Sequence, residues 1–437
     1  MSATTAATAN QLPPTFAALG VAGEICDALA RGGITRTFAI QELTLPMALD
    51  GNDIIGQART GMGKTLGFGI PVIDRVFDDA RITPPDGTPR ALIIVPTREL
   101  CVQVGRDLAG AAKATKLTVT TIYGGRPYEE QIKKLQAGSD IVVGTPGRLI
   151  DLYERGELTL DGVEIMVLDE ADEMLDLGFL PDIEQLFQAV PTQRQTMLFS
   201  ATMPAPILQL ARGFMDRPIH IRAESEDAEA SIHETTRQVV FQSHQMDKLP
   251  VIARILQAHD RGRTIVFART KRAAASVAEQ LGERGFKVTA VHGDMGQNAR
   301  EKSLSSFRSG TTDVLVATDV AARGIDIANV THVINHQVPE DEMTYVHRIG
   351  RTGRAGKSGV AVTLVGWDEL PRWQHINRSL ELEIDEPPQW FSTSPELFDA
   401  LDIPEDADDR VGEHRPVFGA DKVRNRKPSQ RRGPRRR

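Results

Sequence analysis

The strongest constraint on the fold is a set of ten short apolar runs that fall into two series of five. Each run is rich in Val, Ile and Leu and alternates with a helical pattern. Because these runs are apolar throughout, they are typical of parallel strands covered by helices on both faces. The sequence therefore predicts an α/β protein with two tandem domains, each a mostly parallel sheet flanked by helices. The runs lie at 52–56, 91–96, 140–146, 163–169 and 195–202, and then at 264–270, 287–293, 313–319, 332–339 and 359–365.

Polar segments set the expected boundaries of these domains. Residues 222–236, rich in acid and poor in apolar periodicity, are expected to link a first domain at 15–221 to a second at 237–385. We expect residues 1–14 to be flexible, and residues 386–437 to form an acidic spacer followed by a disordered basic tail.

The charge of the chain is uneven. Its net charge is -8, yet the last sixteen residues hold nine Lys or Arg and no acid, which leaves 42 basic against 59 acidic residues before them. Such a tail is expected to attract polyanions, although a solubilising or protein-docking tail would have the same composition.

The cysteine content and the N-terminal composition indicate the cellular compartment in which the protein is expected. Cys26 and Cys101 are the only cysteines, and without metal-ligand spacing they fit a reducing environment. The N-terminus has neither a basic start nor an apolar core, and no apolar run approaches membrane-spanning length. We therefore expect a cytoplasmic protein without a membrane segment, and a monomer.

A glycine-rich loop, GQARTGMGKTLGFG, follows the first apolar run. Gly61 and Gly63 allow backbone amides to approach phosphate oxygens, Lys64 can neutralise the β- and γ-phosphates, and Thr65 can coordinate Mg²⁺ where a helix begins. Ala58 stands where the general pattern has its first glycine. The strand before the loop and the helical pattern after it favour a nucleotide site over a chance glycine-rich turn.

Five acidic side chains crowd the end of another apolar run, in the stretch IMVLDEADEMLDLGF. Buried like charges repel one another, so the cluster needs either solvent or a cation. With a phosphate-binding loop in the same domain, we expect Asp169 to bind the Mg²⁺ held by Thr65. We expect Glu170 to orient and deprotonate an attacking water. Glu173 and Asp176 are expected to be a solvated start of a helix.

These motifs belong to a longer ordered series that resembles the bacterial DEAD-box ATP-dependent RNA helicases. The series is ARTGMGKT at 58–65, PTREL at 96–100, GG at 124–125, TPGR at 145–148, DEAD at 169–172, SAT at 200–202, VFART at 266–270, HGDMGQNAR at 292–300, ATDVAARGID at 317–326 and HRIGRTGR at 347–354. Short members of the series are weak signals, but the ordered set is specific. The resemblance implies two RecA-like domains that use ATP and Mg²⁺.

The resemblance also implies how adenine is recognised. Phe16 would stack on the base and Gln41 would pair with its edge, although Phe16 could instead be a core residue of the N-terminal helix. Thr37, Phe38 and Ala39 replace the Pro-Thr-Pro that is usual in the family. The residues implied to bind the nucleotide are Phe16, Gln41, Ala58, Thr60, Gly61, Gly63, Lys64, Thr65, Gly324 and Asp326.

Arginines of the second domain are expected to complete the ATP site. Arg351 and Arg354 can stabilise a γ-phosphate bound to the first domain, so that hydrolysis depends on closure of the two domains. A role on RNA phosphates or surface acids suits Arg348 better. The remaining catalytic residues are Lys64, Asp169 and Glu170.

RNA contacts follow from the resemblance alone and would be directed at the backbone rather than at bases. The residues implied to bind RNA are Arg98, Gly125, Thr145, Arg148, Arg269, Thr270, Gly293 and Thr318. The residues implied to couple the two sites are Asp172, Ser200, Thr202 and His347.

We therefore expect an RNA-stimulated ATP hydrolase that separates short duplexes without sequence preference, within ribosomal or RNA-decay assemblies. An ATP-gated RNA clamp with little unwinding would use the same motifs. A double-stranded DNA translocase is the other alternative, against which stand the DEAD motif and the Gln41 element.

Overall fold

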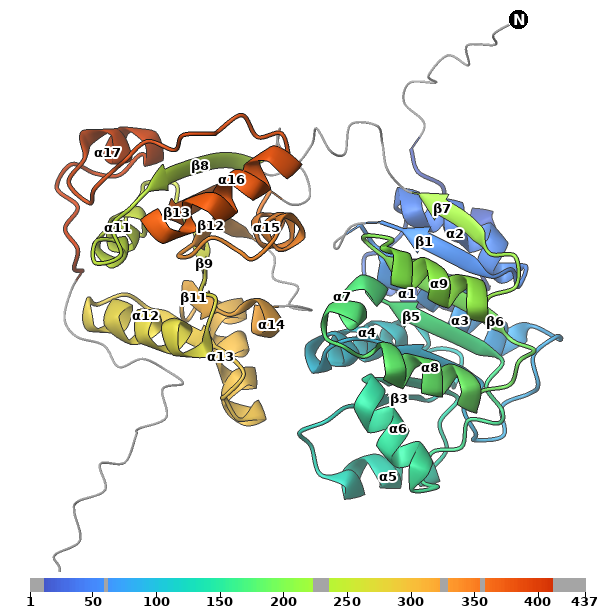
Figure 1. Cartoon of the computed structure of the whole chain (residues 1–437). Coiled ribbons are helices and arrows are strands. Elements are labelled where there is room, and N and C mark those ends of the chain that lie inside the picture. Colours follow the sequence, from blue (N-terminus) through green and yellow to red (C-terminus); the bar gives the residue numbers. More distant parts are fainter. Residues whose placement is uncertain (1–11, 59–61, 223–235, 323–328, 354–357, 412–437) are drawn as a thin grey trace, which may run out of the picture. The chain divides into compact units, whose positions relative to one another are not determined.

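The computed structural model describes residues 12–58, 62–222, 236–322, 329–353 and 358–411 (Figure 1). These residues form two compact units, and the main boundary between them along the chain falls between Thr235 and Thr236. Each unit is a parallel sheet with helices on its faces, so the predicted fold class is confirmed. Our expectations for residues 1–11 and 412–437 lie outside the described residues.

Domain 1 contains a seven-stranded parallel sheet in the order β3-β4-β2-β5-β6-β1-β7. Its strands are β1 (Ile54–Gln57), β2 (Ala91–Ile94), β3 (Val119–Ile122), β4 (Ile141–Gly144), β5 (Ile165–Asp169), β6 (Gln195–Ser200) and β7 (Ile219–Arg222). Its helices are η1 (Ala17–Leu19), α1 (Gly23–Arg31), α2 (Ala39–Leu49), α3 (Lys64–Asp78), α4 (Arg98–Ala111), α5 (Tyr128–Gln136), α6 (Pro146–Glu154), α7 (Ala171–Asp176), α8 (Leu180–Ala189) and α9 (Ala205–Phe214).

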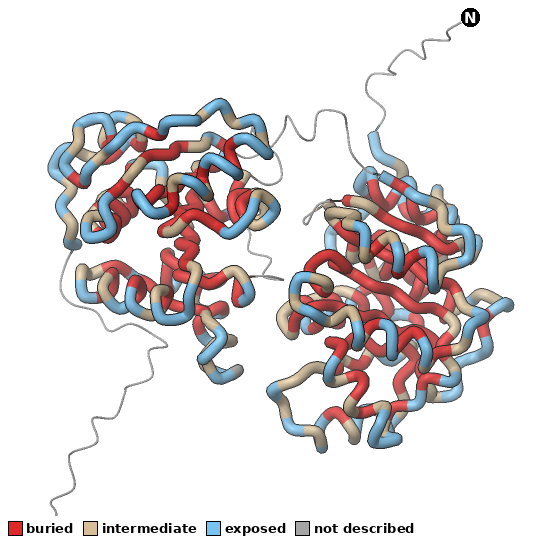
Figure 2. Tube along the Cα trace, in the orientation of Figure 1, coloured by how far each residue is buried: buried red, intermediate tan, exposed pale blue. Residues whose placement is uncertain are grey.

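Both faces of the central part of this sheet are buried, which explains why its central strands are largely apolar. Alternate residues of a strand enter opposite cores: Ile93 and Val167 pack with α1 to α4, whereas Leu92 and Leu168 pack with α6 to α9. Figure 2 shows the central strands of the sheet among the most deeply buried segments.

Domain 2 contains a six-stranded parallel sheet in the order β10-β11-β9-β12-β13-β8. Its strands are β8 (Thr236–Gln242), β9 (Arg263–Phe267), β10 (Val288–Val291), β11 (Val314–Ala317), β12 (Val330–Asn335) and β13 (Gly359–Val365). Its helices are α11 (Lys248–Ile255), α12 (Lys271–Glu283), α13 (Gln297–Ser309), α14 (Asp319–Ala322), α15 (Glu342–Ile349), η2 (Trp367–Glu369), α16 (Leu370–Ser379) and α17 (Pro395–Leu401). Across the described ranges, no helix has the length and apolar content needed to cross a bilayer.

Three strands were not predicted, and all three lie at the edge of a sheet. β3, with the sequence VTTI, and β7, with the sequence IHIR, are only partly buried, so neither is a continuous apolar run. β8 begins at Thr236 and β7 ends at Arg222, so both ends of the predicted linker belong to strands. Residues 223–235 lie outside the described residues.

The acidic spacer predicted from residue 386 onward is wrong for residues 386–411, because this segment folds onto domain 2. Helix α17 buries Leu397 and Leu401 in the core of that domain. The Trp390 ring packs on Phe241 with ring centroids 4.9 Å apart. The segment contains only a few apolar side chains, spaced for one face of a helix, among many acids. The sequence therefore did not predict that they pack in the core of domain 2.

Two buried histidines give domain 2 a stability that depends on pH. Burial lowers the pKa of His332 and His336 to about 4, from an ordinary value of 6.5, and the positive charge of Lys248 adds to the effect at His336. Between these pH values the unfolded chain binds more protons than the folded domain does. Stability is therefore fully present above about pH 6.5 and is lost as the pH falls toward 4.

We expect the free energy of unfolding of domain 2 to fall by about 2 kcal/mol per histidine between pH 7.5 and pH 5. All three tryptophans lie in domain 2, so tryptophan fluorescence during urea unfolding reports this domain alone. A variant carrying His332→Gln and His336→Gln should lose much less stability on acidification. Equal pH dependence of the two proteins would contradict the prediction.

Candidate functional site

The described part of the glycine-rich loop lies at the carboxyl edge of the domain 1 sheet, between β1 and α3. The Ala58 N–H donates to the Ser200 carbonyl over 3.1 Å, which continues the pairing of β1 with β6. Gly63 has a φ of 84°, in the left-handed region that favours glycine, and α3 begins at the next residue. The first backbone N–H groups of α3 therefore lie at this edge of the sheet, in the arrangement that binds phosphate.

Lys64 and Asp169 form the centre of this site. Lys64 is 5% exposed, and its Nζ finds no hydrogen-bond partner among the described residues. Burial raises the pKa of Asp169, the last residue of β5, above its usual range; the Lys64 charge opposes the rise, and the neighbouring carboxylate of Glu170 adds to it. A buried ammonium group without a partner, close to buried carboxylates, suits a site for a phosphate and a cation.

Glu170 takes an unusual backbone conformation in the turn between β5 and α7. Its φ is 54°, which is uncommon for a residue with a side chain, and its N–H donates to Asp169 Oδ1 over 3.0 Å. Glu173 is buried, so our expectation that it is solvated is wrong, whereas Asp176 is exposed as expected. The turn thus keeps several acids near the strand end rather than in solvent.

The three domain 1 residues predicted to couple the sites lie together. The Asp172 N–H donates to Ser200 Oγ over 3.1 Å, and Asp172 Oδ2 accepts from both the N–H and the hydroxyl of Thr202 over 2.8 Å. These bonds tie the start of α7 to the end of β6. Their role in coupling stays a prediction.

The residues expected to recognise adenine are internal. Phe16 is 2% exposed and belongs to the hydrophobic core of domain 1, so its ring presents no face to a ligand and the alternative interpretation, a core residue, fits it. Gln41 is fully buried. Its Oε1 accepts from the Phe38 N–H and its Nε2 donates to the Gly63 carbonyl, each over 2.9 Å.

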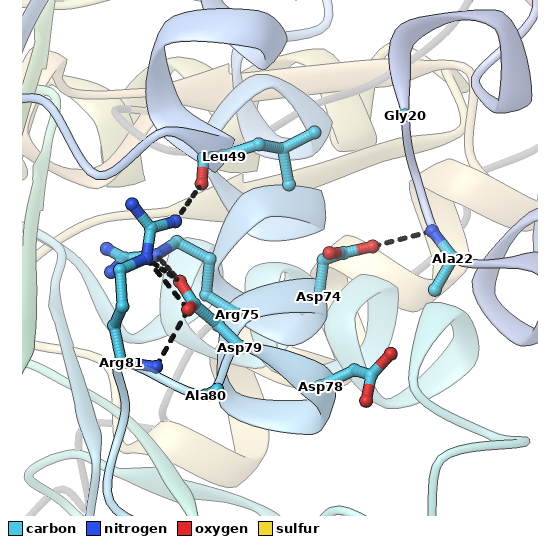
Figure 3. Close-up of a pocket in the computed structure, with 9 residues that line it drawn as sticks. All are labelled: Gly20, Ala22, Leu49, Asp74, Arg75, Asp78, Asp79, Ala80 and Arg81. Carbon is cyan, nitrogen blue, oxygen red and sulfur yellow. Dashed lines mark hydrogen bonds and ion pairs between the residues drawn. The ribbon is translucent and has the colours of Figure 1, made fainter.

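A pocket of about 340 Å³ lies at the other end of α3 (Figure 3). Arg75 and Arg81 both bond to Asp79 there, over 2.8 and 2.9 Å. Asp74 accepts from the Ala22 N–H over 2.7 Å. Helix α3 has 15 residues and is about 22 Å long, so this pocket is separate from the nucleotide loop. Arg75, Arg81 and Asp79 already bind one another there.

The RNA candidates of domain 1 follow three neighbouring strands. Arg98 follows β2, Gly125 follows β3, and Thr145 and Arg148 follow β4. Gly125 has a φ of 83°, which favours glycine, and a Cβ added there would lie 2.4 Å from Arg98 Nη1, so the Arg98 guanidinium lies close against this backbone. The Arg148 guanidinium lies 3.9 Å from the centre of the Tyr128 ring, which holds it in place.

The RNA candidates of domain 2 also follow three adjacent strands. Arg269 and Thr270 follow β9, Gly293 follows β10, and Thr318 follows β11. Arg269 Nη1 lies 3.6 Å from Glu369, a buried acid that the sequence did not reveal as part of the site.

Sheet order separates the two groups of candidates in domain 1. Strands β3, β4 and β2 are neighbours and carry the RNA candidates. The glycine-rich loop follows β1 and the Asp-Glu pair follows β5, and between these two strands lies β6, which carries the coupling candidates Ser200 and Thr202. In domain 2 the RNA candidates also follow three adjacent strands, β10, β11 and β9. In each sheet, the RNA candidates therefore follow three adjacent strands at one side of the sheet.

Arg348 is an internal anchor of domain 2 and does not face RNA. It is 1% exposed, and its guanidinium binds both carboxylate oxygens of Asp319 over 2.6 and 2.8 Å and Asn335 Oδ1 over 3.1 Å. His347 precedes it on α15, and the half-buried Arg351 follows that helix. The candidates that lie outside the described residues are Thr60, Gly61, Gly324, Asp326 and Arg354.

Together, the glycine-rich loop, its buried lysine and the Asp-Glu pair at the end of β5 define a P-loop nucleoside triphosphatase with a second parallel-sheet domain. The DEAD/DEAH box helicase family model matches residues 38–210. The helicase conserved C-terminal domain model matches residues 247–356. The chain therefore belongs to the DEAD-box family of ATP-dependent RNA helicases, as predicted.

Similar proteins extend over most of the chain. The DEAD-box ATP-dependent RNA helicase CshA of Geobacillus kaustophilus is 43% identical over 85% of this chain and 78% of its own length. The CshA protein of Bacillus subtilis is 42% identical over 84% and 72%. Among solved structures, S. cerevisiae Dbp5 bound to RNA and ADP-BeF3 has a TM-score of 0.77 and 29% identity, and covers 89% of this chain and 97% of its own. Mss116 bound to ssRNA and UDP-BeF has a TM-score of 0.75 and 27% identity, and covers 89% and 83%.

Proposed function

We propose that this protein couples ATP binding and hydrolysis to closure of its two domains on RNA, and that closure separates short stretches of duplex without regard to sequence. The observation that carries the proposal is the division of the domain 1 sheet edge, where nucleotide candidates and RNA candidates follow different strands. A ligand at either set can act on the other through the turns that join them, among them the turn held by Asp172. The RNA and nucleotide analogue bound to the similar Dbp5 structure support the same pairing of ligands.

Lys64, Thr65 and Asp169 are the residues that would hold the triphosphate and Mg²⁺. The Lys64 Nζ, buried and without a hydrogen-bond partner among the described residues, suits a β- or γ-phosphate oxygen. The Thr65 hydroxyl and the Asp169 carboxylate are oxygen ligands of the kind that Mg²⁺ prefers. When bound, the metal would neutralise charge on the phosphate oxygens.

Glu170 would hold the attacking water and take its proton. Glu170 lies next to Asp169 in a strained turn, and Asp172 ties that turn to the end of β6. These contacts fix the position of the Glu170 backbone, from which its carboxylate extends. Arg351, with Arg354, would supply positive charge to the γ-phosphate after the domains close. Hydrolysis would then depend on RNA, because RNA favours closure.

The RNA candidates are arginines, threonines and glycines, which contact phosphates and sugars rather than base edges. Sequence-independent binding follows from this composition. Two domains that grip one strand and bend it would exclude the partner strand, so that a few base pairs separate for each ATP.

A strand-displacement assay tests the proposal. A short RNA duplex with a single-stranded extension should separate within a few turnovers of ATP, at similar rates for unrelated sequences, and the Lys64→Ala variant should separate none. Tight ATP-dependent binding without displacement would favour an RNA clamp. Equal stimulation of ATP hydrolysis by double-stranded DNA and by RNA would favour a DNA translocase.

We also propose that the protein acts in the cytoplasm as a monomer, within assemblies for ribosome maturation or RNA decay. Both cysteines are free thiols, and burial raises the pKa of the Cys101 thiol, which makes it unreactive. Crosslinking to RNA in fractionated cells, with and without residues 421–437, should recover ribosomal or decaying RNAs. Recovery from a membrane fraction would contradict the proposal.

A further inference from the structure

A tyrosine at the start of α5 lies against an arginine at the start of α6. Tyr128 is the first residue of α5, and Arg148 lies in the first turn of α6. The guanidinium carbon of Arg148 is 3.9 Å from the centre of the Tyr128 ring, a distance at which the face of the ring attracts a cation. The contact joins the segments that follow β3 and β4, which are neighbours in the sheet.

The Tyr128 ring is itself held in place. It is half-buried and packs against the hydrophobic core that lies under α6 to α9. Its hydroxyl donates to Asp151 Oδ2, and Asp151 Oδ1 accepts from Arg155 Nε over 2.8 Å. The Arg155 guanidinium carbon also lies 4.5 Å from the centre of the ring. The ring therefore has a fixed position from which it can orient Arg148.

Arg148 keeps hydrogen-bond donors for a ligand. Its Nη1 donates to the carbonyl of Arg126 over 3.1 Å, in the segment between Gly125 and α5. A guanidinium carries five N–H donors, so this bond and the Tyr128 ring orient the group while other donors remain for a phosphate oxygen. A long side chain loses rotamer freedom when it binds a ligand, and contacts that order it beforehand reduce that loss.

We propose that Tyr128 is a positioning residue of the RNA site: its ring holds Arg148 in the orientation that meets a backbone phosphate, and so raises the affinity for RNA without touching RNA itself. The proposal rests on the proposed function, in which Arg148 contacts RNA, and adds the residue that prepares this contact. Because the ring carries no charge, its effect on RNA binding depends on Arg148.

A double-mutant cycle tests this dependence. The dissociation constant (Kd) of a fluorescein-labelled oligouridylate is measured by anisotropy, with Mg²⁺ and a non-hydrolysable ATP analogue present. Tyr128→Leu keeps an apolar side chain without an aromatic face and should raise Kd by about 2- to 5-fold. Arg148→Ala should raise Kd by about 10- to 100-fold. Adding Tyr128→Leu to Arg148→Ala should cause no further loss.

Two further variants separate orientation of Arg148 from packing of the core. Tyr128→Phe keeps the aromatic face and should bind RNA with a Kd within about 2-fold of wild type. Tyr153→Leu is the matched control, because Tyr153 is a half-buried tyrosine of α6 that packs against the same core, and its Kd should not change. In Tyr128→Leu, the RNA concentration for half-maximal ATP hydrolysis should rise, while kcat at saturating RNA and the KM for ATP stay unchanged.

Two results would overturn this proposal alone. One is wild-type RNA affinity in Tyr128→Leu, since the ring would then not orient Arg148. The other is an equal loss from Tyr128→Leu with and without Arg148, which would show that Tyr128 acts through packing. Wild type that binds no RNA would instead contradict the proposed function, and the role of Tyr128 with it.

Discussion

An Arg351→Ala variant is expected to lose RNA-stimulated ATP hydrolysis by about 10³- to 10⁵-fold while it keeps its fold. In the proposed mechanism the guanidinium would stabilise charge that develops on the γ-phosphate oxygens, and alanine cannot replace it. The turn that carries Arg351 is well anchored, because its N–H donates to the carbonyl of Arg348, whose side chain is buried on Asp319. The substitution should therefore remove charge without moving the turn.

Single-turnover hydrolysis at saturating RNA measures this effect directly. Arg378→Ala removes an exposed arginine from α16 of the same domain and should leave the rate unchanged. ATP affinity in the absence of RNA should also be unchanged, because Arg351 belongs to the domain without the nucleotide loop. Full RNA-stimulated turnover of the Arg351→Ala protein would contradict the catalytic role that we propose for Arg351 after the domains close.

Lys64→Met is expected to lower hydrolysis by about 10²- to 10³-fold and, at the same time, to keep or raise thermal stability. Hydrolysis falls because the β- and γ-phosphates lose a charged hydrogen-bond donor. Stability is expected not to fall because the buried Nζ of Lys64 has no hydrogen-bond partner among the described residues, so its burial costs free energy that offsets its attraction to Asp169.

The two effects are measured by RNA-stimulated ATP turnover and by the melting temperature of the protein without nucleotide. Lys113→Ala, an exposed lysine of the same domain, is the control and should change neither. A large drop in melting temperature for Lys64→Met would show that Lys64 holds the fold through Asp169. Unchanged turnover would place the triphosphate elsewhere.

The sequence predicted most of the buried strands because their signal is local. A strand covered on both faces must be apolar along its whole length, so β2, β5 and β11 could be recognised one at a time. The edge strands carry no such signal. β3 and β7 are half-polar because one side of each faces solvent, and they were missed.

The candidate site divides in the same way. The phosphate loop and the Asp-Glu pair were predicted because glycine, lysine and carboxylates at fixed spacing meet a requirement of the ligand itself. The contacts of Asp172 with Ser200 and Thr202 join residues about 30 positions apart, and only the pairing of β5 with β6 brings them together. The pair of Arg348 and Asp319 likewise depends on the fold.

The amino-acid sequence by itself determined the order of the motifs, the parallel-sheet class and the chemistry at the end of each central strand, because each depends on residues close together in the chain. Only the tertiary structure decided which phenylalanine is buried and which is exposed, Phe16 or Phe38, and whether residues 386–411 fold. The physical reason is that burial depends on what packs against a side chain, and those partners come from distant parts of the chain.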